Sequence, residues 1–125
     1  GFGCLHCVEQ LQAFGPMSDK FDEAGISLVA IGSEDVDLLK AALDDYEGGM
    51  PFPLLSDAEM KVFRQYRAYD DFEQEPLHGT YLIDGRGDVC WQDISYEPFM
   101  NAQCVHGEAK RLLDQQRDVR TASQR

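Results

Sequence analysis

Basic residues are scarce in this sequence: 11 Lys and Arg stand against 23 Asp and Glu, which gives a net charge of -12. A chain of this charge repels the phosphates of nucleic acids and of anionic lipid surfaces, so we expect neither as a partner. The sequence also lacks an apolar run long enough to span a membrane and the basic-then-apolar layout of a signal peptide. We therefore expect thiol or disulfide proteins and small molecules as partners; the compartment and the oligomeric state stay unassigned.

Cysteine is also rare, since four cysteines in 125 residues are too few for a disulfide framework. A chain of this length can bury a core and fold as one domain without such crosslinks. Two of the four cysteines stand three residues apart, in the motif Cys4-Leu5-His6-Cys7. This spacing indicates thiol chemistry rather than a structural staple.

The first quarter of the chain predicts two helices and a strand. Apolar spacing over residues 5–24 is helical, but Gly15-Pro16 should break the helix because proline lacks an N–H and clashes with the preceding turn. The run Ile26–Ile31 is nearly all apolar, which is typical of a strand covered on both faces. We expect this strand to be central.

The middle of the chain predicts two further helices around a short strand. Residues 36–46 form one apolar helical face, with caps among residues 33–35 and an end at Gly48-Gly49. The prolines of residues 51–55 leave room only for a short edge strand, after which Asp57 should cap a helix that ends near Tyr66. Together these elements form a β-α-β-α order.

The last part of the chain predicts a hairpin and a closing helix. Residues 70–76 are acidic and irregular, whereas residues 80–92 alternate around the turn Gly85-Arg86-Gly87 as a β-hairpin does. Apolar positions over residues 102–113 mark the final helix. The prediction is an α/β protein with a mixed sheet flanked by helices, one domain over residues 1–117, and a polar, frayed tail over residues 118–125.

The position of the two cysteines predicts a reactive dithiol. Cys4 stands where a helix begins, and unpaired N–H groups at a helix N-terminus favour the thiolate. Cys4 can then attack a disulfide or an oxidant, and Cys7, one turn on, can resolve the mixed species. His6 can carry a proton near neutral pH and so stabilise the thiolate, which predicts a lowered Cys4 pKa. These three residues are the candidate catalytic groups.

Several segments resemble the thioredoxin-like superfamily: the Cys-x-x-Cys that opens a helix, the β-α-β order, residues 79–84 with Gly85-x-Gly87, and the closing helix. The tandem helix after the cysteines, the strand at residues 26–31 and Pro53-Leu54-Leu55-Ser56-Asp57 are most similar to its redoxin branch. That branch comprises alkyl hydroperoxide reductase, thiol-specific antioxidant and peroxiredoxin-like proteins. The resemblance implies a thioredoxin fold and an antioxidant thiol oxidoreductase that needs no bound cofactor.

The same resemblance places a second group of candidates before the hairpin. Thioredoxins have a cis-proline there that faces the disulfide, whereas this chain has His78, followed by Gly79 and Thr80. We expect these three residues to orient the substrate. The arginine of peroxiredoxins is missing at this place.

The resemblance also implies an alternative assignment of the cysteines. The peroxiredoxin motif Pro-x-x-x-Thr-x-x-Cys aligns Cys7 with the peroxidatic thiol and Cys4 with the threonine. Cys7 would then meet a hydroperoxide, and Cys4 would resolve the sulfenic acid. The family has a strand that runs into this motif, and here it is missing. We expect either that the chain is a fragment, which upstream residues would stabilise, or that another chain supplies the strand.

Two further alternatives compete with thiol catalysis. Cys104 and His106 could join Cys4 and Cys7 around zinc, but their spacing suits no zinc knuckle, so we expect no metal. The chain could also be a non-catalytic thioredoxin-fold module that retains its dithiol as a structural disulfide. Cys90 is expected to be a small core residue, although a pairing with Cys104 stays open.

Overall fold

The computed structural model describes residues 5–44 and 52–123. It begins with α1 (Leu5–Phe14), continues through a 3-10 turn, η1 (Gly15–Met17), and resumes as α2 (Ser18–Glu23). Pro16 occupies the first turn of η1, where a missing N–H costs nothing. The predicted break at Gly15-Pro16 is confirmed.

The first strand, β1 (Ala30–Gly32), is much shorter than the predicted strand. The N–H of Ile26 donates to the carbonyl oxygen of Phe21 at 2.9 Å. Ile26 therefore still belongs to the turn that ends α2, whereas the sequence predicted that the strand begins there. Val29 is 54% exposed and Ile31 is 41% exposed. The expectation that this strand is covered on both faces is therefore wrong, because one of its faces has no layer packed over it in the described part of the chain.

The helix α3 (Val36–Asp44) begins as the sequence predicts. Its cap is Asp35, whose Oδ1 accepts a hydrogen bond from the N–H of Leu38 at 2.9 Å. The predicted end at Gly48-Gly49 lies outside the described residues.

The short strand β2 (Leu54–Ser56) pairs in parallel with β1, and Ile31 stands opposite Leu55. The helix that follows, α4 (Lys61–Gln65), starts later than predicted, after Met60 in a left-handed conformation (φ 61°). The Asp57 side chain caps the first turn of α4. Its Oδ1 accepts from the N–H of Lys61 at 3.1 Å, and its Oδ2 accepts from the N–H of Phe63 at 2.8 Å. The predicted cap is confirmed.

The segment expected to be irregular instead forms a small hairpin of β3 (Tyr69–Asp70) and β4 (Glu75–Pro76). The Oδ1 atom of Asp70 accepts from the N–H groups of Phe72 and Glu73, which closes the turn. Oδ2 accepts from the Tyr96 hydroxyl at 2.6 Å. This hydrogen bond is the main cause that lowers the pKa of Asp70.

The main hairpin joins β5 (His78–Ile83) to β6 (Val89–Ser95), in agreement with the prediction. Gly87 adopts a φ of 89° in its turn, a conformation that favours glycine. The last helix, α5 (Ala102–Ser123), continues past residue 117, where a frayed tail was expected.

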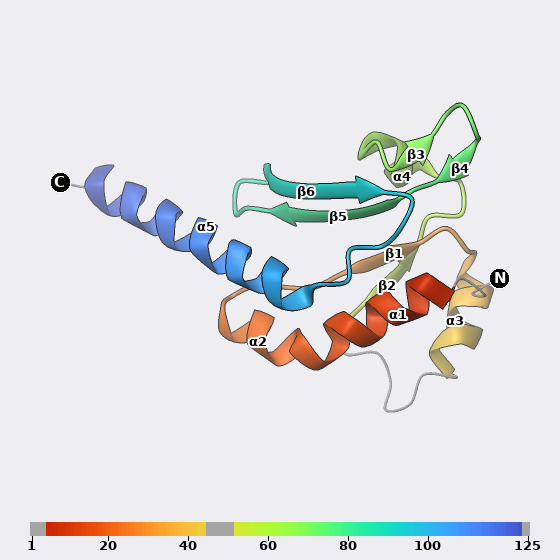
Figure 1. Cartoon of the computed structure of the whole chain (residues 1–125), viewed down its shortest axis with the longest axis horizontal. Helices are drawn as coiled ribbons and strands as arrows, with labels where there is room; N and C mark the ends of the chain where they lie inside the picture. Colours follow the sequence, from red (N-terminus) through yellow and green to blue (C-terminus); the bar gives the residue numbers. More distant parts are fainter. Residues whose placement is uncertain (1–4, 45–51, 124–125) are drawn as a thin grey trace.

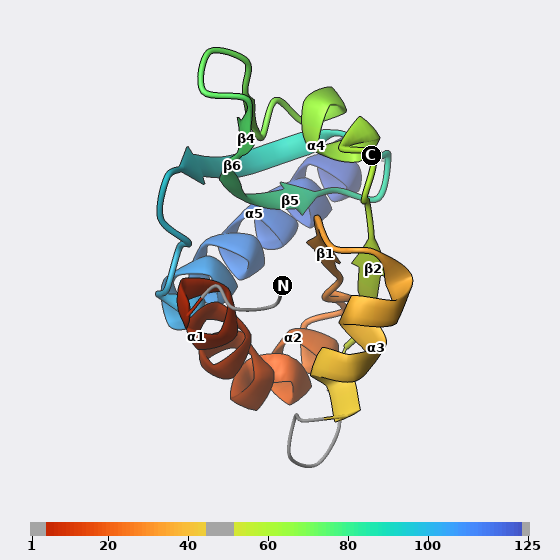
Figure 2. The same ribbon diagram turned by 90° about the vertical axis from the view of Figure 1, so that its right-hand side faces the viewer.

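The described strands form three two-stranded sheets: β1 with β2, β3 with β4, and β5 with β6. Figures 1 and 2 both place the β5–β6 hairpin between α4 on one side and α5 on the other. Contacts agree with this arrangement, since Tyr81 of the hairpin packs on Tyr66 after α4 and the Gln116 amide of α5 donates to Asp84. None of the described helices is both long and apolar enough to cross a membrane.

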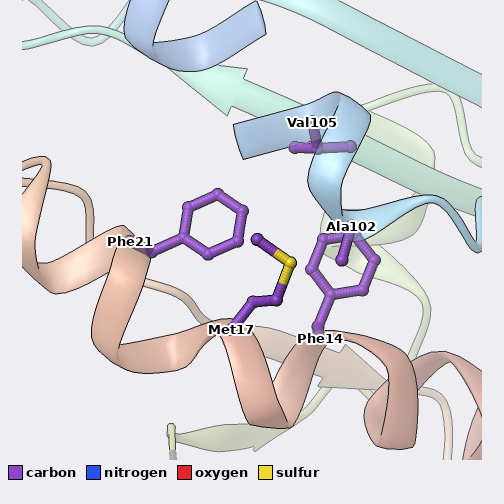
Figure 3. Close-up of a cluster of buried hydrophobic side chains, with 5 residues drawn as sticks. All are labelled: Phe14, Met17, Phe21, Ala102 and Val105. Atoms are coloured by element: carbon purple, nitrogen blue, oxygen red, sulfur yellow. The ribbon is translucent and has the colours of Figure 1, made fainter. Parts of the chain in front are cut away.

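The core lies where the first helices meet the start of α5. Figure 3 shows side chains from α1, η1 and α2 pointing at two side chains of α5. Among the large side chains that the structure describes, Phe21 is the most deeply buried, at 1% exposure. The cluster consists of Phe14, Met17, Phe21, Ala102 and Val105.

We predict that Asp57→Ala destabilises the protein by about 1–3 kcal/mol, because Asp57 is only 8% exposed and two backbone N–H groups lose it as their acceptor. Urea unfolding measures this loss. The matched control is Glu59→Ala, since the ion pair of Glu59 with Lys61 is exposed and should contribute less than about 0.5 kcal/mol. Equal effects of the two substitutions would contradict the capping role.

Candidate active site

Two of the three predicted catalytic residues fall at the start of α1. Cys4 lies outside the described residues, whereas His6 and Cys7 lie in the first turn of α1. N–H groups of a first helical turn have no partner within the helix, so this turn favours negative charge nearby. The second group of candidates, His78, Gly79 and Thr80, begins β5.

A glutamine that the sequence analysis missed connects these two groups. Gln10 lies one turn after Cys7 in α1, and its Nε2 donates to Thr80 Oγ1 at 3.2 Å. The same nitrogen donates to the carbonyl oxygen of Phe99, also at 3.2 Å. The structure thus places the cysteine-bearing helix beside the start of β5, as the predicted site requires. No local pattern in the sequence marks Gln10, because its partners are 70 and 89 residues away.

Packing explains why a glycine stands at position 79. A Cβ atom at this position would lie 2.6 Å from Cε2 of Tyr81. The Tyr81 ring cannot easily move away, because its hydroxyl donates to the carbonyl oxygen of Tyr66 at 2.7 Å. Burial, followed by the neighbouring Tyr66, raises the pKa of Tyr81. Glycine therefore lets β5 pack against the residues after α4.

His78 is half-buried and stands opposite Ser95 in the hairpin. Thr80 is half-buried too and accepts the bond from Gln10. Of the three predicted orienting residues, Thr80 thus forms a hydrogen bond to α1, and Gly79 leaves room for the packing of the Tyr81 ring.

Cys90 and Cys104 are both free thiols in different environments. Cys90 is half-buried in β6, and its Sγ lies 3.5 Å from the carbonyl oxygen of Leu82. Burial, followed by the charge of Asp84, raises the pKa of this thiol. Cys104 is exposed in the first turn of α5. The structure therefore supports the expectation that Cys90 packs.

His106 of α5 is half-buried and contacts α2. Its Nε2 lies 3.2 Å from the carbonyl oxygen of Lys20, and its ring meets the Phe21 ring edge-on at 5.2 Å between centroids. His106 therefore helps to hold α5 against α2.

Within the described part of the chain, no group of three His, Cys, Asp or Glu residues gathers closely enough to hold a metal ion. The zinc alternative needs Cys4, which lies outside that part. A shallow, open hollow of about 470 Å³ lies where α1 and η1 meet the start of α5. Among the residues whose side chains the structure describes, the hollow is lined by Ala13, Met17, Met100, Asn101, Ala102 and Gln103, and the orienting candidates His78, Gly79 and Thr80 lie outside it.

A comparison of the sequence with models of protein families identifies the family of this chain. The model of the AhpC/TSA family matches residues 2–92, which include both cysteines of the motif and most of the β5–β6 hairpin. The chain belongs to the AhpC/TSA family. The family match extends over the helix that carries Cys7 and over Thr80, which Gln10 joins.

Proteins of known sequence and structure agree with the family. The chain is 28% identical to a thioredoxin peroxidase of Echinococcus granulosus over 86% of this chain and 57% of the relative. It is 25% identical to a peroxiredoxin of Thermoplasma volcanium over 68% of this chain and 44% of the relative. The chain thus spans about half the length of these curated relatives.

Solved structures establish the fold. Enterococcus faecalis AhpC matches with a TM-score of 0.80 at 16% identity, over 89% of this chain and 68% of that chain. The reduced 2-Cys peroxiredoxin of Plasmodium vivax also gives 0.80, at 18% identity, over 92% of this chain and 73% of that chain. This AhpC/TSA chain therefore has the predicted thioredoxin fold.

We predict that iodoacetamide at neutral pH modifies Cys104 well before Cys90, because Cys104 is exposed while Cys90 is half-buried with a raised pKa. Peptide mass analysis of quenched samples gives both rates. The Cys90 rate should continue to rise at pH values where an ordinary thiol has levelled off. In urea the two rates should converge, and equal rates in the folded protein would show that Cys90 is not protected.

Proposed function

We propose that this chain acts as a peroxiredoxin-like peroxidase in which Cys7 is the peroxidatic thiol and Cys4 resolves it. The observation that carries the proposal is the match to the AhpC/TSA family over residues 2–92, with Cys7 in the first turn of α1. The relatives are named peroxiredoxin and thioredoxin peroxidase. Hydroperoxides are thus the proposed oxidising substrates.

The proposed reaction has two steps on the protein. The Cys7 thiolate attacks the distal oxygen of the hydroperoxide, the O–O bond breaks, and the leaving alkoxide takes a proton to become an alcohol. Cys7 is then a sulfenic acid. The Cys4 thiol attacks this sulfur, which forms a Cys4–Cys7 disulfide and releases water. A dithiol protein or a small thiol reduces the disulfide and restores both thiols.

Two physical features support this assignment. The first turn of a helix stabilises a thiolate through its unpaired N–H groups and its dipole. A Cys-x-x-Cys spacing also suits a disulfide, because residues three apart on a helix have Cβ atoms about 5–6 Å apart and a disulfide needs roughly 4 Å. His6 stands between the two cysteines and can tune their charge.

The Cys-x-x-Cys spacing favours a second candidate, a thiol–disulfide oxidoreductase in which Cys4 attacks and Cys7 resolves. Family membership supports the peroxidase better than this candidate, and the resemblance to the peroxiredoxin motif implies that the peroxidatic thiol is Cys7. The two candidates differ in which cysteine meets the oxidant first, and single substitutions separate them.

We predict that Cys7→Ser reduces peroxide consumption to the rate of an ordinary protein thiol, whereas Cys4→Ser still reacts once and stops as a sulfenic acid. Serine removes the nucleophile in the first variant and only the resolving step in the second. A rapid-mixing peroxide assay gives the rate, and a sulfenic-acid trap followed by mass analysis identifies the modified residue.

The matched control is Cys104→Ser, because Cys104 is exposed on α5 and should not contribute. A sulfenic acid at Cys4 in the Cys7→Ser variant would favour the oxidoreductase. Absence of any peroxide reaction in the unsubstituted chain would reject the peroxidase.

A further inference from the structure

We infer that Gln10 is a positioning residue for Cys7: its amide fixes the cysteine-bearing turn of α1 against β5. This inference rests on the proposed function, since it concerns the thiol that is to meet the hydroperoxide. It names a residue outside the cysteine motif as a determinant of the rate.

The hydrogen-bond arrangement suits a glutamine in particular. A side-chain amide nitrogen carries two hydrogens, and Nε2 of Gln10 has two acceptors, Thr80 Oγ1 and the carbonyl oxygen of Phe99. Both distances are 3.2 Å, and both bonds are partly buried. A carboxylate at this position would offer no donor to either oxygen, and a shorter amide would fall short of them.

The contacts join three parts of the chain. Gln10 belongs to α1, Thr80 belongs to β5, and Phe99 lies in the segment that leads into α5. Phe99 itself is held by the Trp91 ring of β6 at 5.3 Å between centroids. Both acceptors are therefore attached to the main hairpin.

Gln10 also lies nearer to Cys7 than the core residues of this helical segment do. Phe14 and Met17 anchor the far end of this helical segment in the core cluster. Gln10 lies a full turn closer to Cys7, so its two bonds limit how far the cysteine-bearing turn can tilt away from β5. Attack on an O–O bond needs an aligned sulfur, and a displacement of about 1 Å can lower a rate by roughly 100-fold.

The test compares Gln10→Met with Gln12→Met. Methionine is similar in size to glutamine and uncharged but donates no hydrogen bond. Gln12 is exposed on the same helix and is the matched control. Thr80→Val removes one acceptor from the other side of the contact. Melting temperatures establish that each variant is folded.

Two rates are measured on each variant: oxidation of Cys7 by hydrogen peroxide and alkylation of Cys7 by iodoacetamide. We expect Gln10→Met to lower the peroxide rate constant by about tenfold or more, while the alkylation rate stays within about twofold. Alkylation reports on thiolate formation and depends little on alignment. Thr80→Val should give a smaller loss of the same kind, and Gln12→Met should match the unsubstituted chain.

Three results would overturn the inference. The first is an unchanged peroxide rate in Gln10→Met, and the second is an equal loss in Gln12→Met. The third is a parallel fall of the alkylation rate, because it would mean that Gln10 acts on thiol ionisation.

If the unsubstituted chain does not react with peroxide, the proposed function fails. Amide hydrogen exchange in α1 then tests whether Gln10 holds this helix against β5. Exchange that is at least tenfold faster in Gln10→Met, but not in Gln12→Met, supports the contact. Equal exchange in the two variants rejects it.

Discussion

The buried contact between the first helices and the start of α5 is the interaction on which the rest of the structure depends. Phe14, Met17 and Phe21 meet Ala102 and Val105 although more than 80 residues separate the two groups in the sequence. Burial of each large apolar side chain contributes about 1.5–3 kcal/mol, which makes this cluster a principal source of stability. It also brings the segment before α5 close to α1, so that Gln10 can reach both Phe99 and Thr80.

This packing explains how a short helix is held where the proposed peroxidatic thiol needs it. A reactive thiol needs a helix N-terminus, which attracts negative charge, and a neighbouring strand, which limits access and alignment. The core fixes the far end of α1, and the Gln10 amide ties a point near Cys7 to β5. Gly79 leaves room for the Tyr81 ring of the same strand, which packs against Tyr66. The geometry that supports the proposed peroxidase thus comes from contacts far apart in the sequence.

Local chemistry allowed much of the fold to be predicted from the sequence. Pro16 cannot continue a helix, Asp57 is suited to cap one, and the glycine turn before β6 marks a hairpin, so these features needed no knowledge of distant residues. The β3–β4 hairpin and the role of His106 escaped prediction because they depend on partners elsewhere: Asp70 on Tyr96, and His106 on Phe21. Gln10 escaped for the same reason. The candidate site was located by its cysteines, but its attachment to β5 was not.

The most direct test of the account is to treat the fully reduced chain with one equivalent of hydrogen peroxide and map the thiols by mass analysis. The account predicts loss of two thiols in a disulfide between Cys4 and Cys7, while Cys90 and Cys104 remain free, as they are in the structure. Reduction by a dithiol should restore the starting mass. Four unreacted thiols, or oxidation that falls on Cys90 or Cys104 instead, would contradict the assignment of this chain as a peroxidase that acts through Cys7.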